Sequence, residues 1–216
     1  MNCNSKRKSV LVIIGTAHGI ETPGKCSPDG VFKEYKWSRM MCKRLLKRLQ
    51  DDGYRAVIDH EGLNEIGLSN RAQIVNNYCS VFGSKNVVYV SIHSNASPPN
   101  DNKWHKAKGW SIFVAPNASN NSKKLASYIC QEIEKRDIKV RRPLPKQDWW
   151  EGKFTVLTRT LSPAVLSENM FQDNREDVEF LLSEEGQAKI LEAHVKGIER
   201  YVDELVGITK NEPDSE

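Results

Sequence analysis

The segment Asn86–Ala96 reads Asn-Val-Val-Tyr-Val-Ser-Ile-His-Ser-Asn-Ala. Its first part, Asn86–Ile92, is a nearly continuous apolar run. Such a run predicts a buried strand of a parallel sheet, because strands covered by helices on both faces lack the apolar–polar alternation of half-exposed ones. The run ends directly before His93. This one segment therefore indicates both a class of fold and a place for chemistry.

The same pattern recurs on either side of this segment. Four more apolar runs predict buried strands at Ser9–Ile14, Tyr54–Ile58, Gly109–Ala115 and Pro163–Ser167. Other stretches have apolar residues at the helical period and residues typical of helix ends at their boundaries. They predict helices at Glu34–Asp51, Ser69–Phe82 (with Ser69 as its N-cap), Asn120–Lys135, Arg175–Leu182 and Ser183–Val206. Strands that alternate with helices predict a single α/β domain, with a mostly parallel central sheet and helices on both faces.

Composition limits the possible functions. The chain has 216 residues and no Pro- or Ser-rich linker, so we expect one domain over residues 1–208 and a polar tail over 209–216. With 32 basic and 28 acidic residues, the net charge is only +4, which argues against a dedicated nucleic-acid binder and against an acidic disordered chain. No window has the roughly 18 apolar residues of a membrane span. The basic start and short apolar run at the N-terminus are interpreted as the first strand and not as a leader.

The five cysteines show neither an even count nor a Cys-x-x-Cys spacing, so a disulfide framework and a cysteine-rich zinc site are both disfavoured. Three of them lie in apolar-periodic stretches and are expected to be buried: Cys42, Cys79 and Cys130.

Polar residues that bear chemistry follow three of the predicted strands. His18 follows the first strand, His93 the third and Glu168 the fifth. Ligand sites of open α/β sheets lie beyond the carboxyl ends of the strands, so these side chains converge if their strands are neighbours. Glu34, at the start of the first long helix, is a fourth candidate. Two imidazoles and a carboxylate are typical of a catalytic zinc site, and a further carboxylate would serve as the base.

Each of these residues alone also has a structural interpretation. A single histidine after a strand is commonly a hydrogen-bonded structural residue, Glu34 would be favourable at a helix N-terminus in any case, and Glu168 would pair with an arginine. The remaining histidines are interpreted as structural: His60, His105 and His194.

The motifs occur in an order that resembles the zinc-dependent N-acetylmuramoyl-L-alanine amidases of the amidase-3 type, which are cell-wall hydrolases. The matching segments, in chain order, are Ala17-His18-Gly19 with Thr-Pro-Gly at 22–24, Lys33-Glu34-Tyr35, Asn70-Arg71-Ala72-Gln73-Ile74-Val75-Asn76, Ser91–Ala96, Gly109–Phe113, Pro163–Glu168 with Phe171 and Asn174, and Gly197–Tyr201. The resemblance covers about Val10 to Tyr201. The chain departs from the family pattern at two places. Gly15-Thr16-Ala17 replaces the small residues that usually precede the first histidine, and Met170 stands where the family more often has glycine.

This resemblance implies roles for the candidate residues. His18, Glu34 and His93 would bind Zn²⁺, and Glu168 would be the catalytic carboxylate. The implied reaction is hydrolysis of the amide between N-acetylmuramic acid and L-alanine in peptidoglycan or a muropeptide. Asn95 and Arg71 would hold the ligand loop or the substrate, and a structural salt bridge is an equal alternative for Arg71. A zinc peptidase that acts within the stem peptide, and a non-catalytic peptidoglycan-binding module, are the alternative functions.

The segment Val140–Lys153 is the least family-like part of the chain and is predicted to be a loop. Trp149 and Trp150, with the neighbouring basic residues, would line a substrate groove or simply pack and cover a loop. We expect a monomer that acts on the cell wall, either as a bacterial autolysin in the periplasm or outside the cell, or as a phage endolysin that reaches the wall through a holin.

Overall fold

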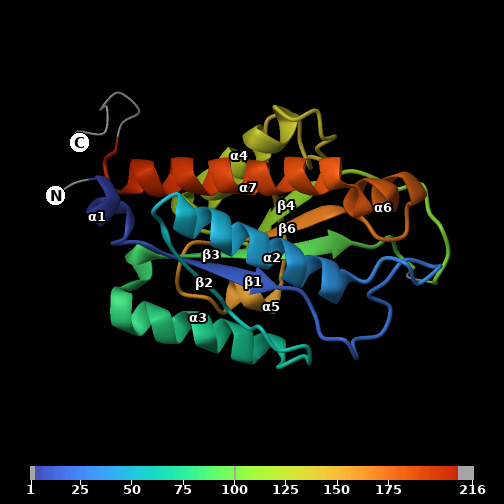
Figure 1. Ribbon diagram of the computed structural model, residues 1–216, viewed down its shortest axis with the longest axis horizontal. Coiled ribbons are helices and arrows are strands. Elements are labelled where there is room, and N and C mark those ends of the chain that lie inside the picture. Colours follow the sequence, from blue (N-terminus) through green and yellow to red (C-terminus); the bar gives the residue numbers. More distant parts are fainter. Residues whose placement is uncertain (1–2, 100, 209–216) are drawn as a thin grey trace.

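The computed structural model describes residues 3–99 and 101–208, and its centre is a six-stranded sheet between two layers of helices (Figure 1). The strand order is β2-β1-β3-β6-β4-β5. The first four strands of that order run parallel, β4 is antiparallel to β6, and β5 is parallel to β4. This confirms the predicted α/β fold with a mostly parallel sheet. The strands are β1 (Leu11–Thr16), β2 (Arg55–Ile58), β3 (Val87–Asn95), β4 (Ser111–Val114), β5 (Trp150–Glu151) and β6 (Ala164–Phe171).

Helices cover both faces of the sheet, as predicted. One face, which we call the α2/α7 face, packs against α2 (Glu34–Asp51), α4 (Asn120–Glu134) and α7 (Glu184–Leu205), and α6 (Arg175–Leu182) leads into α7. The opposite face, the α3/α5 face, packs against α3 (Leu68–Phe82) and α5 (Thr155–Thr158) (Figure 1). Alternate residues of each central strand enter the two cores, which is why the strands are apolar throughout. A short helix α1 (Cys3–Arg7) precedes β1, and a 3₁₀ turn (Ser84–Asn86) precedes β3.

Two strands are longer than predicted, and both extensions carry candidate residues. β3 continues through Asn95 and β6 through Phe171, so His93 and Glu168 lie within strands and not after them. The two residues are paired in register across β3 and β6. The predicted ends at Ile92 and Ser167 are where polar residues begin, and hydropathy alone does not detect strand pairing that continues beyond that point.

Two local predictions are wrong, and two short helices were missed. Ser69 is not the N-cap of α3, because the helix begins at Leu68 after Gly67 and has no side-chain cap. The Ser69 hydroxyl accepts a hydrogen bond from Arg159 instead. Val140–Lys153 is not wholly a loop, since it contains β5. The short helices α1 and α5 were not predicted, because four or five residues are too few to show a helical period.

Other expectations are confirmed or stay predictions. All five cysteines are free, and Cys42, Cys79 and Cys130 are buried. None of the helices in the described part of the chain combines the length and apolar composition that a membrane crossing requires. The predicted tail at 209–216 lies outside the described residues, so the division of the chain at residue 208 stays a prediction.

Candidate active site

His18, Glu34 and His93 come together at the carboxyl edge of the parallel strands. One possible ligand atom from each side chain lies within 4.8 Å of those of the other two. The Glu34 carboxylate is 3.1 Å from Nδ1 of His93 and 3.5 Å from Nε2 of His18. The two imidazole rings are nearly perpendicular, with centroids 5.1 Å apart. Among the residues that the structure describes, this is the one group of three such side chains with metal-binding spacing.

Glu34 is held at this point because it is the first residue of α2. The backbone N–H of Glu34 donates to the carbonyl of Lys25, and its carboxylate accepts a hydrogen bond from the backbone N–H of Ser94 in β3. One turn later, the Ser38 hydroxyl donates to the carbonyl of Ile92 and accepts from the N–H of Ala17. The N-terminal turn of α2 is thus tied to both β1 and β3, and Glu34 is fully buried between them.

His18 adopts an uncommon backbone conformation that its neighbours hold in place. Its φ of 45° lies in the left-handed region, which is costly for a residue other than glycine. On one side, Arg39 donates to the carbonyl of Ala17 at 2.9 Å, and on the other side the N–H of Gly19 donates to the hydroxyl of Thr22. Contacts on both sides keep the imidazole directed at Glu34.

Arg71 lies behind this loop in a buried ion-pair network. It is 2% exposed and donates to the carbonyl of Thr16 at 2.7 Å. Its guanidinium also contacts the carboxylates of Asp59 at 3.2 Å and Glu65 at 3.0 Å. All of these contacts are internal, so of the alternatives stated for Arg71 the geometry favours support of the histidine loop through a salt bridge.

We expect Arg71→Met to lower the free energy of unfolding by about 3–5 kcal/mol, because it leaves the buried Asp59 carboxylate without its cation. Urea denaturation at pH 7 measures this loss. Arg44→Met is the matched control, since Arg44 is exposed and its one side-chain partner is Gln187, and it is expected to change stability by less than about 0.5 kcal/mol. Equal stabilities of the two variants would contradict the role given to the network.

Glu168 lies next to His93 on the α3/α5 face of the sheet. Its Oε2 atom is enclosed and has no hydrogen-bond partner. Burial raises the pKa of Glu168 well above its usual value, and the nearby Glu34 carboxylate raises it further. The side chain is therefore a carboxyl group of unusually high proton affinity beside the His–Glu–His cluster, as general-base catalysis requires.

The electrostatics of the cluster suit a cation. Burial lowers the pKa of His18 to about 4, so its imidazole is neutral at pH 7 and has a lone pair available to a metal. Burial opposes ionisation of Glu34, but the hydrogen bond with His93 and the electrostatic attraction of His18, His93 and Lys25 outweigh it, so the pKa of Glu34 lies below its usual value. One Glu34 oxygen has no hydrogen-bond partner although it is buried. An ionised carboxylate with a free buried oxygen and two imidazoles is a donor set that fits Zn²⁺.

Sequence reasoning missed three groups that support the site. The ammonium of Lys25 lies 3.9 Å from Glu34. Asn169 is fully buried, donates to the carbonyl of His93 at 2.9 Å and accepts from the indole of Trp110. Ser38 ties α2 to the strands. Ser38 and Asn169 contact residues that are far away in the sequence, and only the position of Asn169, next to Glu168, carries a local signal.

The other candidates have contacts outside this cluster. Asn95 ends β3, and its side-chain oxygen accepts from the N–H of Ala96. Trp149 packs against the core of the α2/α7 face. Trp150 lies on β5, and its indole N–H donates to the carbonyl of Arg141.

The remaining histidines have structural partners, in line with their interpretation from the sequence. His60 contacts the carbonyl of Asn64, and His105 pairs with Asp101. His194 is buried in α7 between the Ser167 hydroxyl and a backbone carbonyl, and burial lowers its pKa to about 4.

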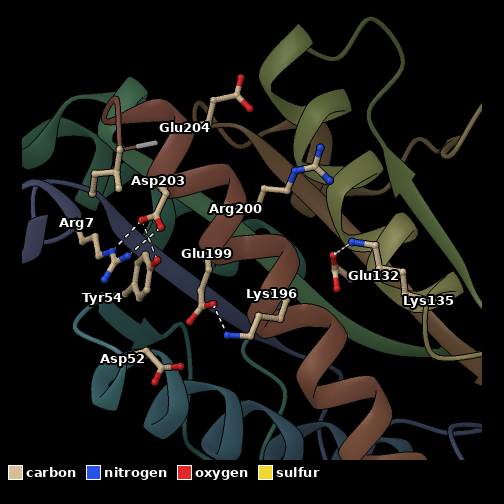
Figure 2. Close-up of a pocket in the computed structure, with 11 residues that line it drawn as sticks. Arg7, Asp52, Tyr54, Glu132, Lys135, Lys196, Glu199, Arg200, Asp203 and Glu204 are labelled. Carbon is tan, nitrogen blue, oxygen red and sulfur yellow. Dashed lines mark hydrogen bonds and ion pairs between the residues drawn. The ribbon is translucent and has the colours of Figure 1, made fainter. Parts of the chain in front are cut away.

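A cavity of about 820 Å³ lies at the opposite edge of the sheet, where the parallel strands begin (Figure 2). Its charged groups are largely paired with one another: Arg7 with Asp203 at 2.9 Å, Lys196 with Glu199 at 2.8 Å and Lys135 with Glu132 at 2.6 Å. Tyr54 also donates to Asp203 (Figure 2). The Arg7–Asp203 pair joins α1 to α7, whereas Lys196–Glu199 lies within α7 and Lys135–Glu132 at the end of α4. Such pairs do not resemble a catalytic centre.

Comparison with known proteins identifies the family. The Amidase_3 family model, described as N-acetylmuramoyl-L-alanine amidase, matches residues 12–200. The chain belongs to this amidase family. The match spans all four residues around the proposed centre, from His18 to Glu168.

The chain is also similar to individual proteins outside the family model. The chain is 28% identical over 198 residues to the uncharacterized protein YqiI of Bacillus subtilis, and the matched region covers 89% of this chain and 85% of YqiI. It is 31% identical over 117 residues to the endolysin of Bacillus phage SPP1, and the matched region covers 51% of this chain and 38% of the endolysin. A crystal structure of an N-acetylmuramoyl-L-alanine amidase from Clostridium difficile 630 has the same fold, with a TM-score of 0.76 and 24% identity over 90% of this chain and 97% of that one.

Proposed function

We propose that this amidase-family protein is a zinc-dependent hydrolase that cleaves the amide between N-acetylmuramic acid and L-alanine in peptidoglycan. The observation that carries the proposal is the cluster of His18, Glu34 and His93, whose candidate ligand atoms lie within 4.8 Å of one another in a chain matched by the amidase family model. Glu168, beside His93, supplies the additional carboxylate that the reaction needs.

In this proposal His18, Glu34 and His93 hold the metal. Zinc, when bound, supplies positive charge that polarises the substrate carbonyl and lowers the pKa of water. Glu168 accepts the proton of the attacking water and delivers it to the departing amine of L-alanine. A cation next to Glu168 favours the ionised form of its carboxyl group and so offsets the rise in pKa caused by burial. The hydrogen bonds at Ala17 and Gly19 hold the backbone on both sides of His18, and the bond from Asn169 holds the carbonyl of His93.

We expect the purified protein, supplied with zinc and muropeptides, to release free stem peptides whose N-terminus is L-alanine. Mass spectrometry of the products detects them, with Glu168→Gln as the control preparation. Cleavage inside the stem peptide, with the lactyl amide intact, would instead indicate a zinc peptidase. Retention on peptidoglycan without any product would indicate a binding module.

A further inference from the structure

Four neighbouring segments place one row of side chains across the α3/α5 face at the level of the candidate site. His93 of β3 is in register with Glu168 of β6, and Glu168 is in register with Ser111 of β4. A parallel bridge pairs Trp110 with Val140. The residues that follow them on the two segments, Ser111 and Arg141, therefore also lie side by side. Paired residues of neighbouring strands share a face, so Arg141 is on the same face as Glu168. Two strand spacings separate them, about 10 Å.

Arg141 differs from the adjacent Arg142 in its partners. Within the described residues, no carboxylate lies within 4.0 Å of the Arg141 guanidinium, which stacks over the ring of Phe171 at 4.6 Å. Arg142 is bound to Glu134 at 2.6 Å and to Asp148 at 3.0 Å. Arg141 is therefore the one of these two arginines that is available to a ligand, and stacking on Phe171 limits the freedom of its side chain.

Aromatic side chains border Arg141 on the same face. Trp150 donates its indole N–H to the Arg141 carbonyl. Its ring lies 6.3 Å from that of Phe113, which contacts Phe154 edge-to-face at 5.2 Å. All three aromatic residues are partly exposed. Apolar neighbours displace water, which strengthens the attraction between a cation and a bound anion.

We infer that Arg141 binds a carboxylate of the peptide stem, on the side of the cleaved amide that bears L-alanine. This inference rests on the proposed function and adds a specificity to it. The distance of about 10 Å between Glu168 and Arg141 corresponds to roughly three residues of extended peptide. The arginine side chain itself extends across part of this distance, so the bound peptide spans only the remainder. The acidic second residue of the stem then lies within reach of the guanidinium when the first residue is at Glu168. A guanidinium binds a carboxylate through two parallel hydrogen bonds.

Two synthetic muramoyl peptides test this inference, one with D-isoglutamate and one with D-isoglutamine at the second position. We expect the zinc-loaded wild-type protein to cleave the acid with a kcat/KM about 10- to 100-fold above that of the amide, the range for a hydrogen bond to a charged group. Arg141→Ala is expected to lose this preference through a higher KM for the acid, so that it cleaves the two peptides with similar kcat/KM. Arg141→Lys is expected to restore part of the preference.

Arg142→Ala is the matched control, because it removes a neighbouring arginine that is already paired. It is expected to keep the preference, and thermal melts of all variants verify that they fold. An Arg141→Ala protein with an undiminished preference would overturn the inference, as would a wild-type protein that cleaves both peptides equally. A wild-type protein that cleaves neither would overturn the proposed function itself.

Discussion

Replacing Glu168 by glutamine is expected to lower turnover by about 10²–10⁴-fold, the usual effect of losing a general base. Glutamine has nearly the same shape but cannot accept the proton of water. Because one Glu168 oxygen is buried without a partner, the substitution removes no hydrogen bond from that atom and should leave the fold intact. Turnover, zinc content and thermal unfolding, measured on one preparation, check the prediction.

The contrary interpretation is that Glu168 only balances a nearby cation such as Lys25. It requires the opposite result for Glu168→Gln, namely reduced stability with an unchanged rate per folded molecule. A variant that kept both zinc and full activity would exclude the amidase mechanism proposed for this residue.

The fold was predictable because its central strands are apolar on both sides. The first two runs, Ser9–Ile14 and Tyr54–Ile58, are short and each is followed by a helical pattern, and this combination is typical of a parallel sheet covered by helices. The two-residue strand β5 was not predictable, since its pairing with Phe113 and Val114 depends on a segment far away in the sequence. The ends of β3 and β6 were missed for the same reason.

The candidate site was predictable in outline because parallel strands bring their carboxyl ends to one edge. That rule brings together residues as distant in sequence as His18 and Glu168. Lys25 and Ser38 contribute through contacts that no spacing reveals. Which of the arginines at 141 and 142 is free is likewise a property of the folded chain, because the partners of Arg142 are Glu134 and Asp148.

The departure from the family pattern at Met170 has a physical explanation. Met170 has a φ of 62°, at an irregularity where the pairing of β3 and β6 shifts between His93 and Asn95. Glycine adopts such a conformation without steric cost, which accounts for its frequent use at this position in the family. In this chain the methionine side chain is buried at 7% exposure within the core, and β6 continues through it to Phe171. The irregularity at Met170 is therefore a bulge within a strand, two residues after Glu168.

Removal of the metal is expected to have the largest effect. We expect close to one zinc per purified chain, loss of activity together with a lower melting temperature on chelation, and recovery of both when zinc is added back. A ligand that binds only the folded state stabilises it by about 4 kcal/mol at a thousandfold excess over Kd, so the melting temperature reports binding independently of catalysis. His18→Ala and His93→Ala should each abolish the zinc-dependent rise in melting temperature.

Glu34→Gln gives the sharpest comparison, because it makes the same chemical change as Glu168→Gln at the other carboxylate of the site. Glu34 lies between the two imidazoles, with its free oxygen directed into the cluster, so its neutral replacement should weaken zinc binding first and activity as a consequence. Glu168→Gln should keep zinc and lose only turnover. If Glu168→Gln lost its zinc while Glu34→Gln kept it, the roles of the two carboxylates would be reversed. Zinc titrations that follow the melting temperature of both variants distinguish these outcomes, because a missing ligand shifts the titration and a missing base does not.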